Sequence, residues 1–462
     1  GNGKLMKTTD GLSGVTEYAY DAMGSPIILK DANNNPIQAK YNALGQKLNV
    51  NDPNMGEKVF TYTQYGEVAS EMDANGDTTY FVYDAIGRLL YRYVNVEPSS
   101  SNQNLAEASF DYDSRGYTYD NKCRVSKQTT EIDGTEFVME NIYDGNYGRV
   151  KALIYPTGLI EHTLYNTRGY VTHSKNASTG YVYQENKKMS VRGQLTEALK
   201  ANGVLTEVTN YHDETGQMDL IYTNTVTGGN QRHRIGYDYD GYGNLETQTV
   251  EKFVNSTNVT SVETYEYDSL HRLTSSALTI GGTAYSTINY DYDAVGNIKY
   301  KDDYASNYVY GDINKTNNNA GPNAVRSVNK NGVGTISFNY DNNGNLISGD
   351  GKAITYNAFN KPLTINKGGV ISYFSYGADQ MRYKQVKTGL TNGTETTYYV
   401  GKSYEQVSYN GVVKEKVYLG DTIVTKTISN SGSSIDAAFV HRDRLGSVVT
   451  ITDENGNVID NK

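Results

Sequence analysis

A short motif that recurs every 21 residues restricts the possible folds of this chain more than any other feature of its sequence. A tyrosine is followed by a polar residue and, three positions after that, by a glycine; the tyrosines of the first copies are Tyr20, Tyr41, Tyr62 and Tyr83. Midway between the copies lie segments rich in Asp, Asn and Gly, which begin at Asp31, Asp52 and Asp73. Such segments mark turns, so each unit is predicted to contain two turns and two strands.

The order of residues within the motif has a physical reason. An Asp or Asn that enters a turn can accept hydrogen bonds from the backbone N–H groups ahead of it, and a later Gly supplies the positive φ that closes a hairpin with a bulge. The sequence therefore predicts structural turn and ladder positions at Tyr20, Asp21, Gly24, Tyr41, Asn42, Gly45, Tyr83, Asp84, Gly87, Tyr239, Asp240, Gly243, Tyr292, Asp293, Gly296, Tyr340, Asp341 and Gly344.

Aromatic residues two positions apart precede many of these turns, as at Tyr18 and Tyr20 or Phe81 and Tyr83. Period two places both rings on one face of a strand, so stacked repeats are expected to form a ladder of rings. The chain has 43 Tyr against 9 Phe and no Trp, and hydrophobic residues, Tyr included, make up 37%. Dense apolar cores are therefore disfavoured, and the rings are expected to supply much of the burial.

The number of repeats predicts a long sheet. Two strands per 21 residues give at most about 44 strands, and a ribbon of that many strands would be roughly 200 Å long. Sheets of this length twist and curl, and closing the ribbon into one circuit gives a diameter of about 60 Å, too wide for side chains to fill. The predicted fold is an all-β repeat protein, a long antiparallel β-hairpin strip curled into a spiral hollow shell. A parallel β-helix remains the alternative.

Charge and composition argue against several classes of partner. The chain carries 42 basic and 52 acidic residues, a net charge of −10, which disfavours nucleic-acid binding. No apolar run is long enough to predict a membrane-spanning helix. Cys123 is the only cysteine, so an intrachain disulfide is excluded.

Residue types that carry chemistry are present but scattered. His233, between Arg232 and Arg234, forms the only cluster among six His residues, and a solvated strand or loop is favoured there over a catalytic base. Paired acids of a glycosidase remain formally possible, yet the acids recur at turn positions. The oxygen-rich segments that begin at Asp341 and Asp453 have Gly at position 4 rather than 6, which differs from an EF-hand. We therefore expect no catalytic, cofactor-binding or metal-binding residues and no enzymatic activity.

The tandem motif, together with the C-terminal third of the chain, resembles the RHS, or tyrosine-aspartate repeat, family. The resemblance covers about 17 to 459, and its most specific segments are Gly321-Pro-Asn-Ala-Val325, the copies that start at Tyr340 and Tyr356, Tyr376–Lys384, and His441–Asn457. By this resemblance, residues 1–310 are tandem repeats, 311–440 are repeats with a loop insertion, and 441–462 are the start of an RHS-associated core that is cut short.

The resemblance implies a hollow β-cocoon that encloses a variable C-terminal toxin or effector polypeptide. It therefore implies a structural shell of a secreted or surface-located bacterial protein, whose partner is a polypeptide cargo outside these 462 residues. Neither self-cleavage nor toxicity is carried over, because the motifs that complete the core are missing. The alternative function is a cell-surface adhesion module that binds carbohydrate or partner proteins through exposed rings.

Overall fold

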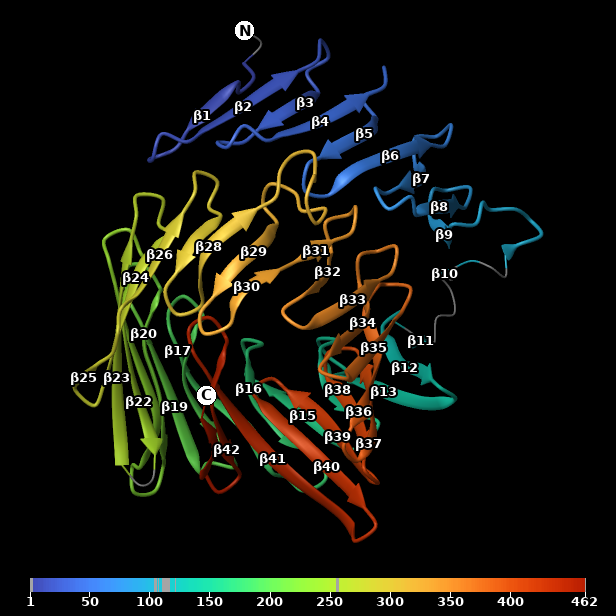
Figure 1. Cartoon of the computed structure of the whole chain (residues 1–462). Helices are drawn as coiled ribbons and strands as arrows, with labels where there is room; N and C mark the ends of the chain where they lie inside the picture. Colours follow the sequence, from blue (N-terminus) through green and yellow to red (C-terminus); the bar gives the residue numbers. More distant parts are fainter. Residues whose placement is uncertain are drawn as a thin grey trace. The chain divides into compact units, whose positions relative to one another are not determined.

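The computed structural model describes residues 3–103, 106, 108–109, 117–120, 122–254 and 257–461, and the regular elements within them are all β-strands (Figure 1). The chain forms two compact units. The first unit comprises Gly1–Tyr112, Tyr267–Ser275 and Ile288–Leu390, and the second comprises Asp113–Glu266, Ser276–Thr287 and Thr391–Lys462. None of the described residues forms a helix long and apolar enough to cross a membrane.

The strands of the first unit are short and follow one another closely. They are β1 (Lys7–Thr9), β2 (Val15–Tyr20), β3 (Pro26–Lys30), β4 (Pro36–Tyr41), β5 (Lys47–Asp52), β6 (Gly56–Tyr62), β7 (Val68–Met72), β8 (Thr78–Tyr83), β9 (Leu89–Val94), β10 (Ala108–Ser109), β26 (Ile288–Tyr292), β27 (Ile298–Lys301), β28 (Ala305–Tyr310), β29 (Val325–Lys330), β30 (Gly334–Ser337), β31 (Asn339–Tyr340), β32 (Leu346–Gly349), β33 (Lys352–Tyr356), β34 (Pro362–Lys367), β35 (Val370–Tyr376) and β36 (Arg382–Leu390).

The second unit contains several longer strands. They are β11 (Tyr117–Tyr119), β12 (Val125–Ile132), β13 (Thr135–Tyr143), β14 (Val150–Ile154), β15 (Ile160–Tyr165), β16 (Val171–Asn176), β17 (Val182–Met189), β18 (Leu195–Lys200), β19 (Leu205–Tyr211), β20 (Met218–Thr225), β21 (Gln231–Tyr239), β22 (Leu245–Val254), β23 (Thr257–Tyr267), β25 (Thr283–Ala284), β37 (Gly393–Val400), β38 (Tyr404–Tyr409), β39 (Val412–Leu419), β40 (Thr422–Ser429), β41 (Gly432–Arg442), β42 (Val448–Asp453) and β43 (Val458–Asn461). The residues of β24 (Leu273–Ile280) are divided between the two ranges, and Tyr267, the last residue of β23, falls in the first unit.

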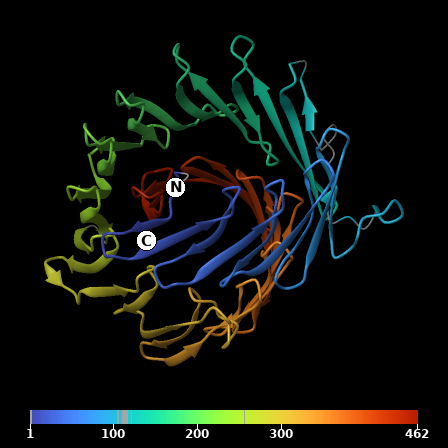
Figure 2. The ribbon, with the colours of Figure 1, turned by 90° about the horizontal axis from the view of Figure 1, so that it is seen from above.

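Within each sheet, strands that follow one another in the sequence lie side by side and pair antiparallel. Strands β1 to β10 form one ten-stranded sheet in sequence order, and Figure 2 shows the blue strands at the start of the chain lying edge to edge. The predicted all-β antiparallel repeat fold is confirmed, and the parallel β-helix alternative is wrong. The Asp-x-x-Gly turns account for this outcome, because they reverse the chain direction between successive strands.

A register shift occurs where the motif tyrosine enters its turn. In the pairing of β2 with β3, Ala19 lies opposite Ile28, but Tyr20 lies opposite Pro26. The same irregularity falls at the motif tyrosines of β4, β6, β8, β21, β26 and β31. Each hairpin therefore closes with a bulge that recurs once per repeat.

Burial comes from small clusters rather than from one large core. One cluster in the second unit consists of Ile221, Ile235, Tyr237 and Leu245. Ile235 and Tyr237 lie two positions apart on β21, and the other two lie on the neighbouring strands β20 and β22. Another consists of Ala201, Leu205 and Phe439. This arrangement agrees with the low content of apolar residues, because alternation along a strand leaves one face for packing.

Turns that are far apart in the sequence interlock in the first unit. The Asn33 amide donates to Asp293 over 2.7 Å, and the backbone N–H of Asn323 donates to the Asn54 side chain over 2.8 Å. The Asn75 amide donates to Asp341 over 3.1 Å. The partners are separated by 260, 269 and 266 residues. Successive turns of the early repeats are thus seated on successive turns of the later repeats.

Candidate functional site

The predicted motif residues lie in hydrogen-bonded turns at the strand ends. Asp21 Oδ1 accepts the backbone N–H groups of Met23 over 2.9 Å and Ser25 over 2.8 Å, and Gly24 has a φ of 89°. The bond from Ser25 is the main reason why the pKa of Asp21 is lowered. The same turn geometry is present at Asn42 with Gly45, Asp84 with Gly87, Asp240 with Gly243, Asp293 with Gly296 and Asp341 with Gly344.

The hydroxyl group of the motif tyrosine links neighbouring repeats. Tyr83 Oη donates to the carbonyl oxygen of Val68 over 2.9 Å, and Val68 lies two residues after Gly66, which closes the preceding turn. The same kind of bond is made by Tyr20, Tyr239, Tyr292 and Tyr340. Tyr41 ends β4 in the equivalent position but has no such bond among the described residues. Burial raises the pKa of Tyr83, which keeps its hydroxyl protonated as a donor.

Sequence reasoning predicted the packing of the rings but missed the role of the hydroxyl. The signal was present, because the motif position is filled by Tyr while the chain has 43 Tyr against 9 Phe. A purely apolar ladder would accept Phe equally well. The motif residues lie at separate turns and do not gather into one chemical site.

A cluster of ionisable side chains is buried in the second unit instead. Lys200 of β18 is 1% exposed, and its Nζ lies 2.8 Å from Glu207 Oε1 in an ion pair whose angle is outside hydrogen-bond geometry. His441 of β41 is fully buried, and its Nδ1 lies 2.9 Å from Glu207 Oε2, while its Nε2 lies 3.0 Å from the Thr452 hydroxyl. Glu207 therefore links its own strand, β19, to β41, and the two residues in contact are 234 positions apart in the sequence.

His233 belongs to the same cluster, and the expectation that it is solvated is wrong. Its side chain is 1% exposed. Side chains along β21 alternate between the two faces of the sheet, and His233, Ile235 and Tyr237 lie on the buried face. Its ring lies 5.0 Å from that of His441 between centroids. Neither ring nitrogen has a hydrogen-bond partner among the described residues.

Burial determines the charge states in this cluster. Burial, followed by the proximity of His441, lowers the pKa of His233 to about 3. Burial also lowers the pKa of His441, although Glu207 opposes the shift. Burial alone would raise the pKa of Glu207, but Lys200 and His441 lower it overall. At neutral pH both imidazoles are thus neutral and lie near the ionised Glu207 carboxylate. These groups are closed to solvent, so the geometry suits packing rather than work on a substrate.

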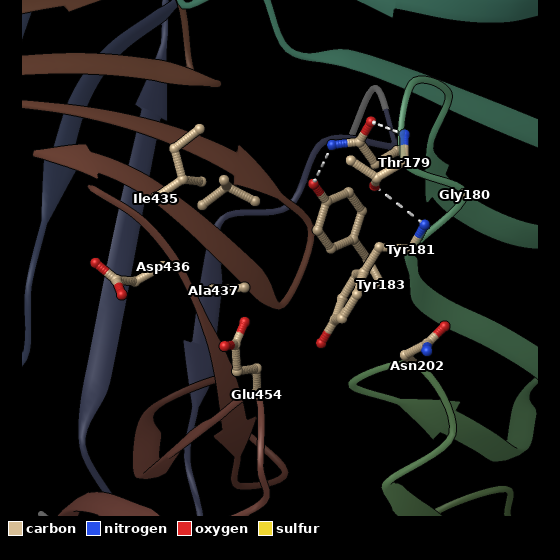
Figure 3. Close-up of a pocket in the computed structure, with 11 residues that line it drawn as sticks. Thr179, Gly180, Tyr181, Tyr183, Asn202, Ile435, Asp436, Ala437 and Glu454 are labelled. Atoms are coloured by element: carbon tan, nitrogen blue, oxygen red, sulfur yellow. Dashed lines mark hydrogen bonds between the residues drawn. The ribbon is translucent and has the colours of Figure 1, made fainter. Parts of the chain in front are cut away.

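A cavity of about 470 Å³ opens elsewhere in the second unit. Tyr181, next to β17, and Tyr183 within it form one wall, with ring centroids 5.4 Å apart. Figure 3 shows Ile435 and Ala437 of β41 across from the rings, and Glu454 below them. Burial, with Glu454 nearby, raises the pKa of Tyr181 to about 12. We call this cavity the Tyr181 pocket. Sequence reasoning did not find it, because its walls come from strands far apart in the chain.

The oxygen-rich segments considered for calcium are turns of the ordinary kind. Asp341 accepts the backbone N–H of Asn345 over 2.8 Å, and Asp453 accepts those of Asn455 and Asn457 over 2.9 and 2.7 Å. Across the residues that the structure describes, no three His, Cys, Asp or Glu side chains are grouped so that they could hold a metal ion.

Comparison with known proteins gives a match at the level of structure. No protein-family model and no curated protein matches the sequence. The fold is similar to a crystal structure of TcdB2-TccC3 without its hypervariable C-terminal region, with a TM-score of 0.78 and 16% identity over 97% of this chain. It is also similar to TcdB2-TccC3-Cdc42, with a TM-score of 0.77 and 16% identity over 96% of this chain.

A Photorhabdus luminescens Tc holotoxin pore that carries a substitution in TccC3 is similar as well, with a TM-score of 0.71 and 14% identity over 97% of this chain. In each case this chain spans 26% of the length of the solved chain. At such low identity the similarity shows the fold alone. The chain therefore has the all-β fold found in a part of the TcdB2-TccC3 chains.

Proposed function

We propose that this chain is a non-enzymatic wall segment of an RHS-type shell, in a secreted or surface-located bacterial protein, and that the shell encloses a toxin or another polypeptide. The observation that carries the proposal is the structural similarity to TcdB2-TccC3, which extends over 97% of this chain. The tandem tyrosine-aspartate motif supports it independently. In this function the protein acts by excluding solvent and proteases from its cargo.

The local construction of the fold suits such a wall. Each repeat is joined to the next by a ladder of backbone hydrogen bonds and by the hydroxyl bond of its motif tyrosine, as between Tyr83 and Val68. Interlocked turns, such as those of Asn75 and Asp341, join early repeats to late ones within the first unit. The two histidines with clearly lowered pKa values in the buried cluster, His233 and His441, are both buried, so they present no reactive group at the surface.

Protease protection tests this function directly. The natural protein that contains this chain would be treated with a nonspecific protease, and cleavage of the polypeptide outside the repeats would be followed over time. We expect that polypeptide to be cleaved at least about tenfold more slowly than the same polypeptide expressed alone, as closure of the shell requires. Equal cleavage rates, or a natural protein with no polypeptide beyond its repeats, would contradict the proposal.

A second candidate function is carbohydrate binding at a cell surface. It is favoured by the exposed rings at turn tips, where Tyr65, Tyr147 and Tyr242 are 82%, 74% and 85% exposed. Rings in such positions offer faces on which sugars can stack. A glycan array probed with the full chain and with a Tyr65→Ser, Tyr147→Ser and Tyr242→Ser variant tests this. Binding that is lost in the variant would support adhesion, and no binding by the full chain would exclude it.

A further inference from the structure

We propose that the Tyr181 pocket binds the cationic side chain of an arginine or lysine from another polypeptide segment. The proposal does not depend on whether the chain encloses a cargo, because it follows from the pocket alone. A volume of about 470 Å³ is within the usual range for ligand pockets and leaves room for such a side chain with part of its backbone.

The charge of the pocket has one sign. Glu454 lines it, is exposed to solvent and makes no ion pair with the described residues. No Lys or Arg is among the residues that line the pocket. In Figure 3 the carboxylate of Asp436 points away from the two rings, whereas Glu454 lies between Ala437 and the rings' side of the pocket. A cation that enters would therefore meet an uncompensated negative charge.

The pocket also has an apolar part. Its residues are Val424, Ile435 and Ala437, and Figure 3 shows Ile435 and Ala437 on the side of the pocket where Glu454 lies, across from the rings. Lysine and arginine have an aliphatic stem below a charged head, and they characteristically lay the stem on apolar surface while the head contacts polar groups. The pocket offers both surfaces to one side chain, which a compact inorganic cation would not use.

Hydrogen-bonding capacity remains unused beside the charge. Tyr181 Oη is shielded from solvent and has no hydrogen-bond partner among the described residues. An unpartnered buried hydroxyl is unfavourable, and an N–H donor that enters next to it would relieve this. A sugar is a poorer fit, because Tyr183 is only 4% exposed and offers no open ring face for stacking.

The backbone that carries Glu454 is held in place by a closely packed turn. Glu454 is the second residue of a turn in which Asp453 Oδ1 accepts the backbone N–H groups of Asn455 and Asn457. A Cβ placed on Gly456 of this turn would lie 3.0 Å from the Leu205 side chain, so the turn is closely packed on β19. Because the turn is already ordered, less conformational entropy of the protein is lost when a ligand binds.

Saturation-transfer NMR with the full chain tests the proposal. The probes are N-acetyl-arginine amide and N-acetyl-lysine amide, each paired with an uncharged analogue, N-acetyl-citrulline amide and N-acetyl-norleucine amide. We expect saturation transfer to the cations and much less to the analogues. Glu454→Gln should raise the Kd by about tenfold or more, and Tyr181→Phe, which removes only the hydroxyl group, by a few fold.

Glu246→Gln serves as the matched control, because Glu246 is an exposed acid of the second unit that does not line the pocket. It should leave the Kd unchanged. The proposal is overturned if the cations give no signal at millimolar concentration, if the analogues bind equally well, or if Glu454→Gln and Glu246→Gln have the same effect. Each of these results would leave the protease-protection experiment unaffected, so the two proposals fail separately.

Discussion

At the scale of single residues, the motif tyrosine joins two functions in one side chain. Its ring supplies buried area, and its hydroxyl group satisfies a carbonyl oxygen two residues past the preceding turn, as Tyr83 does for Val68. Carbonyl groups just after a bulge are left outside the regular ladder, so a side-chain donor at this point stabilises the irregularity. The tyrosine of one repeat thereby stabilises the bulge of the preceding repeat.

Replacing Tyr83 by Phe tests the function of the hydroxyl group. The ring is kept and one hydrogen bond is lost, so the free energy of unfolding should fall by about 1 kcal/mol in urea titrations. Tyr65→Phe is the control, since Tyr65 is 82% exposed at a turn tip. If both variants lose the same stability, the hydroxyl bond is not what stabilises the repeat.

The turn-closing position requires a positive φ, yet some repeats fill it with residues other than glycine. Cys123 has a φ of 58° there, in a turn where Asp120 accepts the backbone N–H of Lys122 and Arg124. A side chain in this conformation costs about 1 to 2 kcal/mol, and a glycine would avoid that cost.

Cys123→Gly is therefore expected to stabilise the protein. Greater flexibility of the unfolded chain offsets part of the gain, which leaves about 0.5 to 1 kcal/mol, measurable as a higher Tm. Cys123→Ala keeps the backbone strain and should give no increase. An equal increase for both variants would show that the thiol, rather than the backbone conformation, was unfavourable.

The buried histidines make stability depend on pH. In the unfolded chain His233 titrates near its ordinary pKa of 6.5, but in the folded protein its pKa is lowered to about 3. Between these values the unfolded state binds the extra proton, so stability is full above pH 6.5 and falls as the pH drops. The loss for His233 should be about 1.4 kcal/mol per pH unit below 6.5.

Urea unfolding at several pH values between 7 and 5 measures this slope. His233→Leu should flatten it, while the remaining slope comes from His441, whose pKa is also lowered. Glu207, which contacts His441 and pairs with Lys200, has a lowered pKa and stays ionised in this range. His212→Asn is the control at an exposed turn and should keep the full slope. A wild-type protein with no slope would contradict the buried, neutral state of His233.

At the scale of elements, the interlocked turns explain why glycine is required where two turns meet. A Cβ on Gly321 would lie 2.6 Å from both Asn54 Cα and the Pro53 carbonyl oxygen. Both are backbone atoms that cannot move aside cheaply. The contact therefore depends on the absence of a side chain at this position.

Gly321→Ala should force these turns apart. We expect a loss of about 1 to 3 kcal/mol, with faster hydrogen exchange in the first unit around Asn54. Gly241→Ala is the matched control, because a Cβ at Gly241 would meet nothing within 4 Å. If Gly321→Ala is as stable as Gly241→Ala, the turns do not interlock in solution.

The elements could be predicted well from the sequence because their causes are local. The spacing between Tyr20 and Tyr41 and the Asp-x-x-Gly order determine strand, turn and bulge within a single repeat. The buried cluster and the Tyr181 pocket could not be predicted in this way. Their members, such as Glu207 and His441, are 234 residues apart, and no local pattern encodes that contact. The prediction that His233 is solvated was wrong for the same reason, because the strand that covers it is distant in the sequence.

At the scale of the whole molecule, the chain consists of two compact units, each built from an early and a late part of the sequence. The prediction of antiparallel order along the chain is confirmed by the strand pairing. The divisions at residues 310 and 440, expected from the resemblance, remain predictions. The proposed function as a container likewise rests on the fold similarity and on the motif, and it requires an empty interior.

Single-particle electron microscopy of the natural protein that contains this chain measures that interior most directly. Our account predicts a β-rich wall around a region of low density, wide enough for a polypeptide, with extra density there when the cargo is present. Solid globules, or a narrow coil whose centre is filled by its own side chains, would contradict it.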